Sequence, residues 1–390
     1  MDRRTFLAAG SIAATAPLAG WPALSSTATG ATAAANSAHP HPPVNFWSDG
    51  LGLGPVDYAA QLQEAARTGA WSPDSYSNGG LVADIERAFA QRLGKPAAVY
   101  LPSGTLANHL AVRTLAGAGR RVLVQAESHL YNDSGDGAAT LSGLNLVPLA
   151  KGRATLSVED VAPWVERSSG GRVPNEVGVI SVESPVRRLD HAMADLEQTG
   201  RLSRFARERG IRLHLDGSRM FNLPLHTGRS VADVAAMFDT VYVSLWKHFN
   251  GTAGAVLAGD EATIAGLSHV RRMFGASLPQ AWPTLALVPL HLPRYEDDYA
   301  RAWGAADRLI ALLEASGRFS ARKVENGTSR FHLSAPGADL DALAGRAAQH
   351  GVLLPGGPPD ATAFAMQVNP SLLHRPPEAI SQALLASLDA

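Results

Sequence analysis

The sequence predicts an α/β protein with a mainly parallel sheet and a smaller C-terminal α+β domain. From about residue 97, short apolar runs alternate with segments of helical spacing. This pattern is typical of parallel strands covered by helices on both faces. After about residue 290, a long helical segment and separate strands replace the alternation. The 390 residues are 46% apolar and 18% charged, which is ordinary globular composition with ample material for a large core.

The apolar runs and the helical spacing locate the individual elements. The predicted strands are Ala97–Leu101, Arg121–Gln125, Leu144–Leu149, Val177–Glu183, Ile211–Leu215, Thr240–Leu245 and Ala253–Ala258. The predicted helices are Asp57–Arg67, Leu81–Leu93, Leu106–Leu115, Gln198–Arg209, Ala300–Ala315 and Pro377–Leu388. Two further segments, Arg318–Leu333 and Gly351–Val368, are predicted as strands and loops. The expected organisation is a leader over residues 1–35, an N-terminal arm over 36–80, a large domain over 81–290 and a small domain over 291–390.

Composition and charge exclude several classes of function. The net charge of −1, without a basic run, gives no indication of a nucleic-acid or membrane-surface partner. Cysteine is absent, which rules out disulfides, thiolate metal sites and a cysteine nucleophile. A hydrolase has little support, because the sequence has neither a G-x-S-x-G elbow nor a metal-spaced histidine pair, and no metal site is expected.

The first residues are expected to form a twin-arginine signal. Arg3-Arg4 is followed by Thr5-Phe6-Leu7, a weakly apolar stretch, and a small-residue region with several A-x-A-like cleavage options. The apolar stretch is too short for a stable membrane span. The expected location is therefore periplasmic or secreted, and the alternative is a disordered alanine-rich tail. The twin-arginine route carries folded proteins and is often used when a cofactor is inserted before export.

Lys247 and Asp216 are the central chemical candidates. Lys247 follows a predicted strand and precedes the turn residues Asn250-Gly251. A partly desolvated lysine at a strand end has a lowered pKa and can form an imine with a carbonyl cofactor. Asp216 ends the preceding predicted strand, which puts both residues at the same edge of the sheet. A carboxylate there can keep a pyridinium nitrogen protonated, so that the ring acts as an electron sink. The alternatives are a surface lysine that caps a strand and an ordinary Asp-Gly turn.

Other polar residues also follow predicted strands. Ser103, Gly104 and Thr105 open a helix, where backbone N–H groups and two hydroxyls can cradle a phosphate; Ser and Thr are also ordinary helix caps. His129 is placed to stack on a flat cofactor ring, although a lone histidine is more often structural. Arg219 can bind a carboxylate through its planar guanidinium, or form a surface salt bridge. Each signal is moderate, but their order along successive strand ends predicts one cofactor site.

These residues resemble the threonine aldolases within the β-eliminating lyase group of fold-type I enzymes that depend on pyridoxal phosphate (PLP). The resemblance covers about residues 45–290, and more weakly extends to 390. The motifs that carry it are HLDGSRMFN (His214–Asn222), PSGTLAN (Pro102–Asn108), ESHLYNDSGDGAATLSG (Glu127–Gly143) and DSYSNGGLVADIE (Asp74–Glu86), together with Gly254 seven residues after Lys247.

The resemblance implies a PLP-dependent transferase-like large domain, a small C-terminal domain, and a homodimer or homotetramer with active sites at subunit interfaces. It implies that Lys247 forms the Schiff base with PLP, that His129 stacks on the ring, and that Tyr76 reaches the cofactor phosphate of a neighbouring subunit. Arg219 and Ser48 are the implied ligands of the substrate carboxylate. The implied reaction cleaves a threonine-like β-hydroxy-α-amino acid to glycine and an aldehyde, with His129, His248 or a water as the base.

Several segments depart from the family pattern, mostly where substrate is expected. The glycine-rich turn after the lysine is His248-Phe249-Asn250, and the arginine before Ser48-Asp49 is Trp47. The Glu-Asn-Thr-His-Asn segment is Glu183–Arg187, the turn over residues 275–280 lacks its arginine, and a late arginine is missing around Ala363–Gln367. Candidate replacements are Arg187, Arg188 and Arg330. The alternatives are therefore another PLP reaction, such as β-elimination, racemisation or decarboxylation, or a catalytically inactive exported binding protein.

Overall fold

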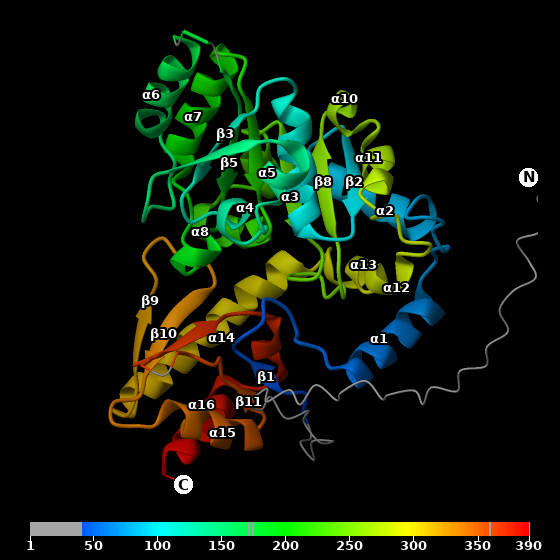
Figure 1. The fold of residues 1–390 in the computed structure, drawn as a ribbon. Helices are drawn as coiled ribbons and strands as arrows, with labels where there is room; N and C mark the ends of the chain where they lie inside the picture. The colour runs from blue at the N-terminus through cyan, green and yellow to red at the C-terminus, as the bar shows by residue number, and fades with distance from the viewer. Residues whose placement is uncertain (1–40, 171, 174, 359, 390) are drawn as a thin grey trace, which may run out of the picture. The chain divides into compact units, whose positions relative to one another are not determined.

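A seven-stranded sheet is the centre of the fold (Figure 1). The structure is a computed structural model that describes residues 41–389 except 171, 174 and 359. The predicted twin-arginine leader lies outside the described residues. The strand order is β2-β8-β7-β6-β5-β3-β4. The strands are β2 (Ala97–Leu101), β8 (Ala255–Gly259), β7 (Thr240–Ser244), β6 (Arg212–Asp216), β5 (Val177–Glu183), β3 (Arg121–Gln125) and β4 (Asn145–Leu149).

The prediction of a mainly parallel sheet is confirmed. Strands β7, β6, β5, β3 and β4 pair in parallel, while β8 is antiparallel to both of its neighbours, β2 and β7. Strand β2 therefore points in the same direction as the parallel strands. Six strands consequently present their carboxyl ends at one edge of the sheet, where ligands bind in open α/β sheets.

Both faces of the sheet are covered, as alternate residues along each strand show. On β7, Val241 and Val243 belong to one buried apolar cluster, whereas Tyr242 belongs to another on the opposite face. The first cluster includes Leu81 and Phe89 of one helix, and the second includes Leu110 of another. Successive side chains along a strand point to opposite faces. Because both faces are buried, each strand is a continuous apolar run rather than an alternating one.

Helices surround the sheet and follow its strands in sequence. The helices between residues 55 and 235 are α1 (Pro55–Thr68), α2 (Gly80–Leu93), α3 (Gly104–Ala116), α4 (His129–Asn132), α5 (Gly137–Ser142), α6 (Val158–Ser169), α7 (Leu196–Glu208), α8 (Leu223–Thr227) and α9 (Val231–Ala235). The later helices are α10 (Glu261–Ile264), α11 (Leu267–Met273), α12 (Trp282–Leu285), α13 (Val288–His291), α14 (Tyr295–Ala315), α15 (Leu340–Gln349) and α16 (Pro377–Asp389). Short 3-10 helices in the described part of the chain are η1 (Arg187–Leu189), η2 (Met220–Asn222) and η3 (Pro370–His374). Of the described helices, none combines the length and the apolar character that crossing a bilayer demands.

Helix α6 was not predicted, and its sequence explains why. Pro163 lies inside the helix, where proline normally breaks the hydrogen-bond ladder. A capping box offsets this cost: the Ser157 hydroxyl accepts from the backbone N–H of Asp160, and the Asp160 carboxylate accepts from the backbone N–H of Ser157. Helix α15 was also missed, because its ten residues lie between the two segments that the sequence predicts as strands and loops.

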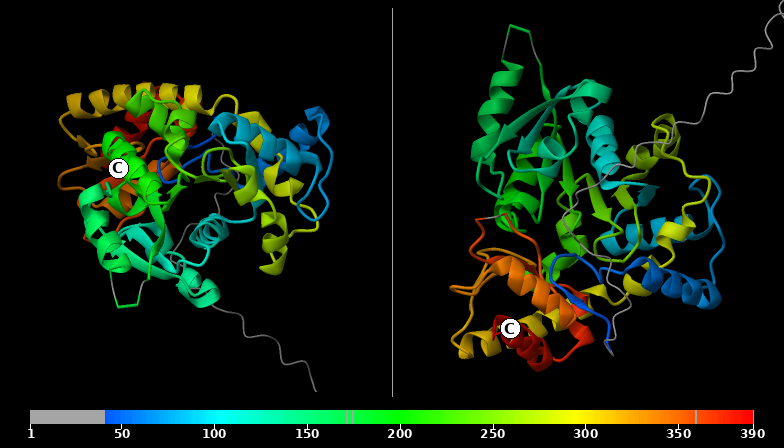
Figure 2. Two further views of the ribbon diagram at one scale, coloured as in Figure 1. Left: turned by 90° about the horizontal axis from the view of Figure 1, so that it is seen from above. Right: turned by 60° about the horizontal axis from the view of Figure 1, so that its bottom comes forward.

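The C-terminal strands and helices gather beside α14 (Figures 1 and 2). Strands β9 (Ser320–Lys323), β10 (Arg330–Ser334) and β12 (Phe364–Gln367) form an antiparallel sheet in the order β12-β10-β9. Strand β1 (Val44–Asn45), near the start of the described chain, pairs in parallel with β11 (Val352–Leu353). The N-terminal arm is thereby joined to the C-terminal part of the chain.

The segment before α2 is fixed by one buried carboxylate. Asp74 accepts hydrogen bonds from the backbone N–H groups of Ser77, Ala281 and Trp282, at 2.8–3.0 Å. Arg271 holds the same segment from the other side, because its guanidinium donates to the backbone oxygen of Ser77. The loop that carries Tyr76 is therefore a rigid part of the fold.

We expect Asp74→Ala to lower the free energy of unfolding by about 3 kcal/mol, because it leaves three backbone donors without their acceptor. Urea unfolding followed by circular dichroism measures this change. Asp84→Ala is the matched control, since Asp84 forms only an exposed ion pair with Arg87 and should cost less than about 1 kcal/mol. Equal losses in the two variants would contradict the anchoring role of Asp74.

Candidate active site

The sequence-predicted candidates follow the carboxyl ends of neighbouring strands. Ser103 follows β2, His129 follows β3, Asp216 ends β6, and Lys247 follows β7. The sheet order puts these strand ends along one edge, as the sequence predicts. Glu183, which ends β5 and pairs in register with Asp216, is a further carboxylate at this edge that the sequence analysis did not single out.

Asp216 is held by a chain of buried polar side chains. Its Oδ2 accepts from Asn108 Nδ2 at 2.6 Å, and Asn108 Oδ1 is 2.9 Å from His214 Nε2. His214 Nδ1 is in turn 2.8 Å from the hydroxyl of Thr240. Burial lowers the pKa of His214 to about 4, so the ring is neutral and one nitrogen donates while the other accepts. This arrangement fixes the direction in which the carboxylate points. Asn108 and His214 lie inside the recognised motifs, but these roles depend on contacts between α3 and β6.

Lys247 is almost fully buried, with 8% of its surface exposed. Burial, and then the charge of Arg219, lowers its pKa from 10.5 to about 8, although Asp49, Asp216 and Glu183 act in the opposite direction. The indole of Trp246 lies beside the amine, 5.5 Å from Nζ to the ring centroid. An appreciable fraction of the amine is therefore neutral and nucleophilic near neutral pH.

Arg219 forms a buried bidentate ion pair. Its Nε and one terminal nitrogen donate to the two carboxylate oxygens of Asp49, at 2.8 and 2.9 Å. Gln367 on β12 donates to the same carboxylate at 3.2 Å. Burial alone would raise the pKa of Asp49, but the guanidinium holds it well below its usual range. Arg219, predicted to bind a carboxylate, thus has the carboxylate of Asp49 as its partner. Its other terminal nitrogen takes no part in this ion pair.

His129 and Glu183 are coupled through the backbone. The Glu183 carboxylate accepts from the backbone N–H of His129 at 2.6 Å and from that of Arg187 at 2.8 Å. Burial, reinforced by the negative charge of Asp216, raises the pKa of Glu183. Burial lowers the pKa of His129, whose Nδ1 is buried without a hydrogen-bond partner. Glu183 therefore fixes the start of α4, and with it a neutral imidazole close to Asp216 and Lys247.

The start of α3 forms a narrow cradle. Ser103 caps the helix, accepting from the backbone N–H of Leu106 at 3.2 Å, so its expected capping role is present. A side chain at position 104 would place its Cβ only 1.9 Å from the hydroxyl of Tyr242, which makes glycine necessary there. Ser244, two residues further along β7 and on the same face as Tyr242, has a buried hydroxyl with no hydrogen-bond partner. Helix N–H groups and a free hydroxyl thus converge on a site that suits an anion.

Comparison with known proteins agrees with this arrangement. Residues 54–353 match the beta-eliminating lyase family. The chain belongs to that family. The low-specificity L-threonine aldolase of Candida albicans is 29% identical over 229 residues, which are 58% of this chain but only 60% of that relative. The low specificity L-threonine aldolase of Saccharomyces cerevisiae is 26% identical over 328 residues, 83% of each chain. A putative L-allo-threonine aldolase from Listeria monocytogenes has a solved structure with a TM-score of 0.73 and 26% identity, covering 90% of this chain and 96% of that one.

The residues at this edge of the sheet fit PLP. The unpartnered Ser244 hydroxyl and the α3 N-terminus match its phosphate, the buried Asp216 carboxylate matches its pyridinium nitrogen, and Lys247 matches its aldehyde. His129, whose Nδ1 has no hydrogen-bond partner, is close enough to Asp216 and Lys247 for both charges to act on its pKa. Ser244 was missed in the sequence analysis, although its place three residues before the lysine, at the end of the same strand, was an available signal.

Two other predicted residues lie in less direct positions. The Ser48 hydroxyl is engaged locally, donating to the backbone oxygen of Gly50 at 2.7 Å or to Asn45 Oδ1 at 2.8 Å. The side chain of Tyr76 is half exposed, and its ring lies 5.3 Å from the guanidinium carbon of Arg272. The implied contact of Tyr76 with a neighbouring subunit stays a prediction. Arg272 lies just before the turn over residues 275–280, which lacks the family arginine, and the fold brings it next to Tyr76.

The three candidate replacements for the missing arginine differ in their surroundings. Arg187 and Arg188 both pair with Asp133, at 2.6 and 2.8 Å. Arg330 on β10 pairs with Asp190 at 3.0 Å. Arg330 and Lys247 both act on the pKa of the buried His191, and Arg187 and Lys247 both act on the pKa of His129, so Arg187 and Arg330 approach the lysine from different segments.

Two more buried histidines surround the lysine. His191 uses Nδ1 in a 2.8 Å hydrogen bond with Ser329, while its Nε2 is buried and unpartnered. His248 stacks on Tyr295, with ring centroids 4.4 Å apart, and neither of its nitrogens has a partner. Burial lowers the pKa of both rings, to about 3 for His248, so both are neutral near pH 7. His191 was missed because it lies in a turn outside every recognised motif.

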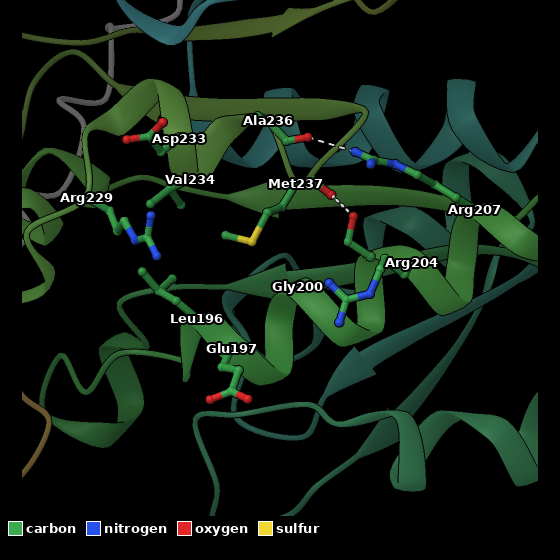
Figure 3. Close-up of a pocket in the computed structure, with 11 residues that line it drawn as sticks. Leu196, Glu197, Gly200, Arg204, Arg207, Arg229, Asp233, Val234, Ala236 and Met237 are labelled. Carbon is green, nitrogen blue, oxygen red and sulfur yellow. Dashed lines mark hydrogen bonds between the residues drawn. The ribbon is translucent and has the colours of Figure 1, made fainter.

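A separate cavity of about 600 Å³ lies between α7 and the segment Asp233–Met237 (Figure 3). At one side of it, Arg207 donates to the backbone oxygen of Ala236 at 2.8 Å. No residue from the strand ends described above lines this cavity, so it is not part of the lysine site. Among the residues that the structure describes, no cluster of histidine, aspartate or glutamate side chains has an arrangement that would hold a metal ion.

The pKa of Lys247 gives a direct prediction. In the cofactor-free protein, the rate at which its ε-amine is acylated should rise with pH and reach half of its maximum near pH 8, because only the neutral amine reacts. Peptide mass spectrometry after short exposure to an acylating reagent measures this rate. In Asp216→Asn the midpoint should move to lower pH, since the Asp216 charge raises the pKa of the lysine. A midpoint above about pH 10, the ordinary lysine value, would be incompatible with this site.

Proposed function

We propose that this lyase is a PLP-dependent aldolase that cleaves a threonine-like β-hydroxy-α-amino acid to glycine and an aldehyde. The observation that carries the proposal is the buried Lys247, with a lowered pKa, at the strand edge that also holds the anchored Asp216. The names of the relatives, low-specificity L-threonine aldolases and a putative L-allo-threonine aldolase, support the choice of reaction.

The residues that would hold the cofactor are Lys247, Asp216, His129, Ser244 and the backbone at the start of α3. When bound, PLP supplies an electron sink that stabilises the negative charge left at Cα of the substrate. Asp216, fixed by Asn108, would keep a proton on the ring nitrogen. Ser244 and the α3 N–H groups would hold the phosphate, and His129 would contact the cofactor.

His129 is the residue that we assign to the proton of the β-hydroxyl. Its Nδ1 has no partner, and its lowered pKa keeps the ring neutral and able to accept a proton. The Glu183 carboxylate holds its backbone in place. When Nδ1 takes the hydroxyl proton, the Cα–Cβ bond can break as the aldehyde C=O forms, and a proton returned to Cα completes glycine.

Arg219 is oriented for the substrate carboxylate by its pair with Asp49. The pair occupies Nε and one terminal nitrogen, so the other terminal nitrogen, Nη1, is the donor that remains for substrate. Arg330 supports it from β10, where Asp190 fixes its guanidinium. This division of roles replaces the late arginine that the family pattern has near the end of the chain.

We expect Lys247→Ala to abolish the borohydride-reducible attachment of PLP and to reduce glycine release from threonine or a related β-hydroxy amino acid by at least about a thousandfold. Absorption spectroscopy before and after borohydride follows the first effect, and amino-acid and aldehyde analysis follows the second. Asp216→Asn should retain the attachment but lose most of the activity, because the carboxylate acts on the ring and not on the lysine bond.

Product analysis also tests the choice of reaction. Release of ammonia and a keto acid, without glycine, would assign β-elimination and overturn the aldolase proposal. A protein that binds no PLP when it is added, and changes no amino acid, would instead be an inactive binding protein.

We also propose that the protein is exported by the twin-arginine route and works as a homo-oligomer in the periplasm or outside the cell. The Arg3-Arg4 pair, with its apolar and small-residue sequel, supports export. The half-exposed Tyr76 on a rigid loop supports contact with a second subunit. Replacing Arg3 and Arg4 with lysine should leave the protein in the cytoplasm, as cell fractionation would detect, and unchanged export would contradict the route.

A further inference from the structure

Two exposed tryptophans lie on one small cavity beside the reactive lysine. Trp47 is 57% exposed and Trp246 is 49% exposed, whereas most large apolar side chains of the described residues are buried. They come from segments 199 residues apart, yet both line the same cavity of about 280 Å³. Trp246 also places its ring 5.5 Å from Lys247 Nζ, so the cavity adjoins the point where chemistry occurs.

The rest of the cavity is rigid and carries almost no charge. Tyr58 forms part of the wall, and its hydroxyl donates to the backbone oxygen of Pro283 at 2.6 Å. Asn250 ties the two segments together, because its Oδ1 accepts from the backbone N–H of Leu51 at 2.9 Å. The one ionisable carboxylate on the cavity, Asp49, is already paired with Arg219. A charged substituent would find no free counter-charge here, whereas an apolar ring would cover two indoles.

We propose that this cavity is the subsite for the β-substituent of the substrate, and that it selects an aromatic or large apolar group over the methyl group of threonine. The inference rests on the proposed function for the identity of the group that enters. The physical reason is area: a methyl group leaves both indole faces in contact with water, whereas an aryl group removes them from it.

Binding of amino acids that cannot be cleaved tests the subsite separately from the aldolase reaction. L-Phenylalanine and L-alanine lack a β-hydroxyl group, so neither can undergo the cleavage. Tryptophan fluorescence titration of the PLP-loaded protein should show phenylalanine binding at least about tenfold more tightly than alanine. Trp47→Ala and Trp246→Ala should each remove most of this preference, while Trp246→Phe should keep it within about threefold.

Turnover provides the second arm. The kcat/KM for β-phenylserine should exceed that for threonine by about tenfold or more, and this ratio should fall toward one in the alanine variants. Leu290→Ala, which removes another exposed apolar side chain that is not on the cavity, is the matched control and should leave the ratio unchanged. Circular dichroism tests whether each variant is folded. If an alanine variant is unfolded, Trp246→Phe still tests whether an aromatic side chain at this position is enough for the preference.

Each outcome separates the two proposals. If phenylalanine binds no more tightly than alanine, the subsite is wrong, whether or not the protein is an aldolase. If the alanine variants keep the preference but lose oligomeric mass in light scattering, the tryptophans belong to an interface between copies of the chain, and the subsite is again wrong. If the preference is present and is lost in the variants, but no glycine forms from β-phenylserine, the aromatic subsite stands and the aldolase proposal fails.

Discussion

The buried ion pair between Asp49 and Arg219 is the interaction on which the site depends. It joins the N-terminal arm to the segment after β6. Gln367, on a strand of the C-terminal sheet, donates a hydrogen bond to the same Asp49 carboxylate. An unpaired charge at this depth would cost several kcal/mol, so the arm and both sheets are constrained to meet there. The pair also acts on the lysine, because Arg219 lowers the pKa of Lys247 while Asp49 raises it.

Around this pair, burial sets the protonation state of each group that the chemistry needs. The imidazoles of His129, His191 and His248 all have lowered pKa values because they are removed from water, so they are neutral acceptors and not cations. Glu183 has a raised pKa because it is buried beside Asp216. Its oxygens nevertheless accept two backbone N–H groups, which explains how a carboxylate is tolerated there. The site thus has neutral imidazoles that can accept a proton, and a carboxyl group with a raised pKa, near the reactive amine of Lys247.

The residues around the expected cofactor agree with the family pattern better than those where substrate is expected. Around the expected cofactor site, Asn108, His214 and Thr240 form a buried hydrogen-bond chain behind Asp216. On the side where substrate is expected, Trp47 and His248 depart from the family pattern. Trp47 and Trp246 line one cavity, and His248 packs on Tyr295 of α14. A substrate with an aromatic β-substituent, which we propose above, would account for both patterns.

The sequence by itself determined the strands of the sheet, the residues at their ends and the family. Buried strands are continuous apolar runs, which is a local property, so Ala97–Leu101, Arg121–Gln125 and Val177–Glu183 were located to the residue. Lys247 and Asp216 stood out because a lysine and an aspartate directly after such runs are chemically unusual.

Only the tertiary structure decided which of these side chains are available. Arg219 was predicted to bind a carboxylate or to form a surface salt bridge, but its partner is the buried Asp49, 170 residues away in the sequence. The orphan hydroxyl of Ser244, the buried His191 and the meeting of the two tryptophans likewise arise from contacts between distant segments. Local patterns record which residues are apolar and where strands end. Burial, charge neighbours and cavities depend on the whole packed chain, and therefore they appear only once the chain is folded.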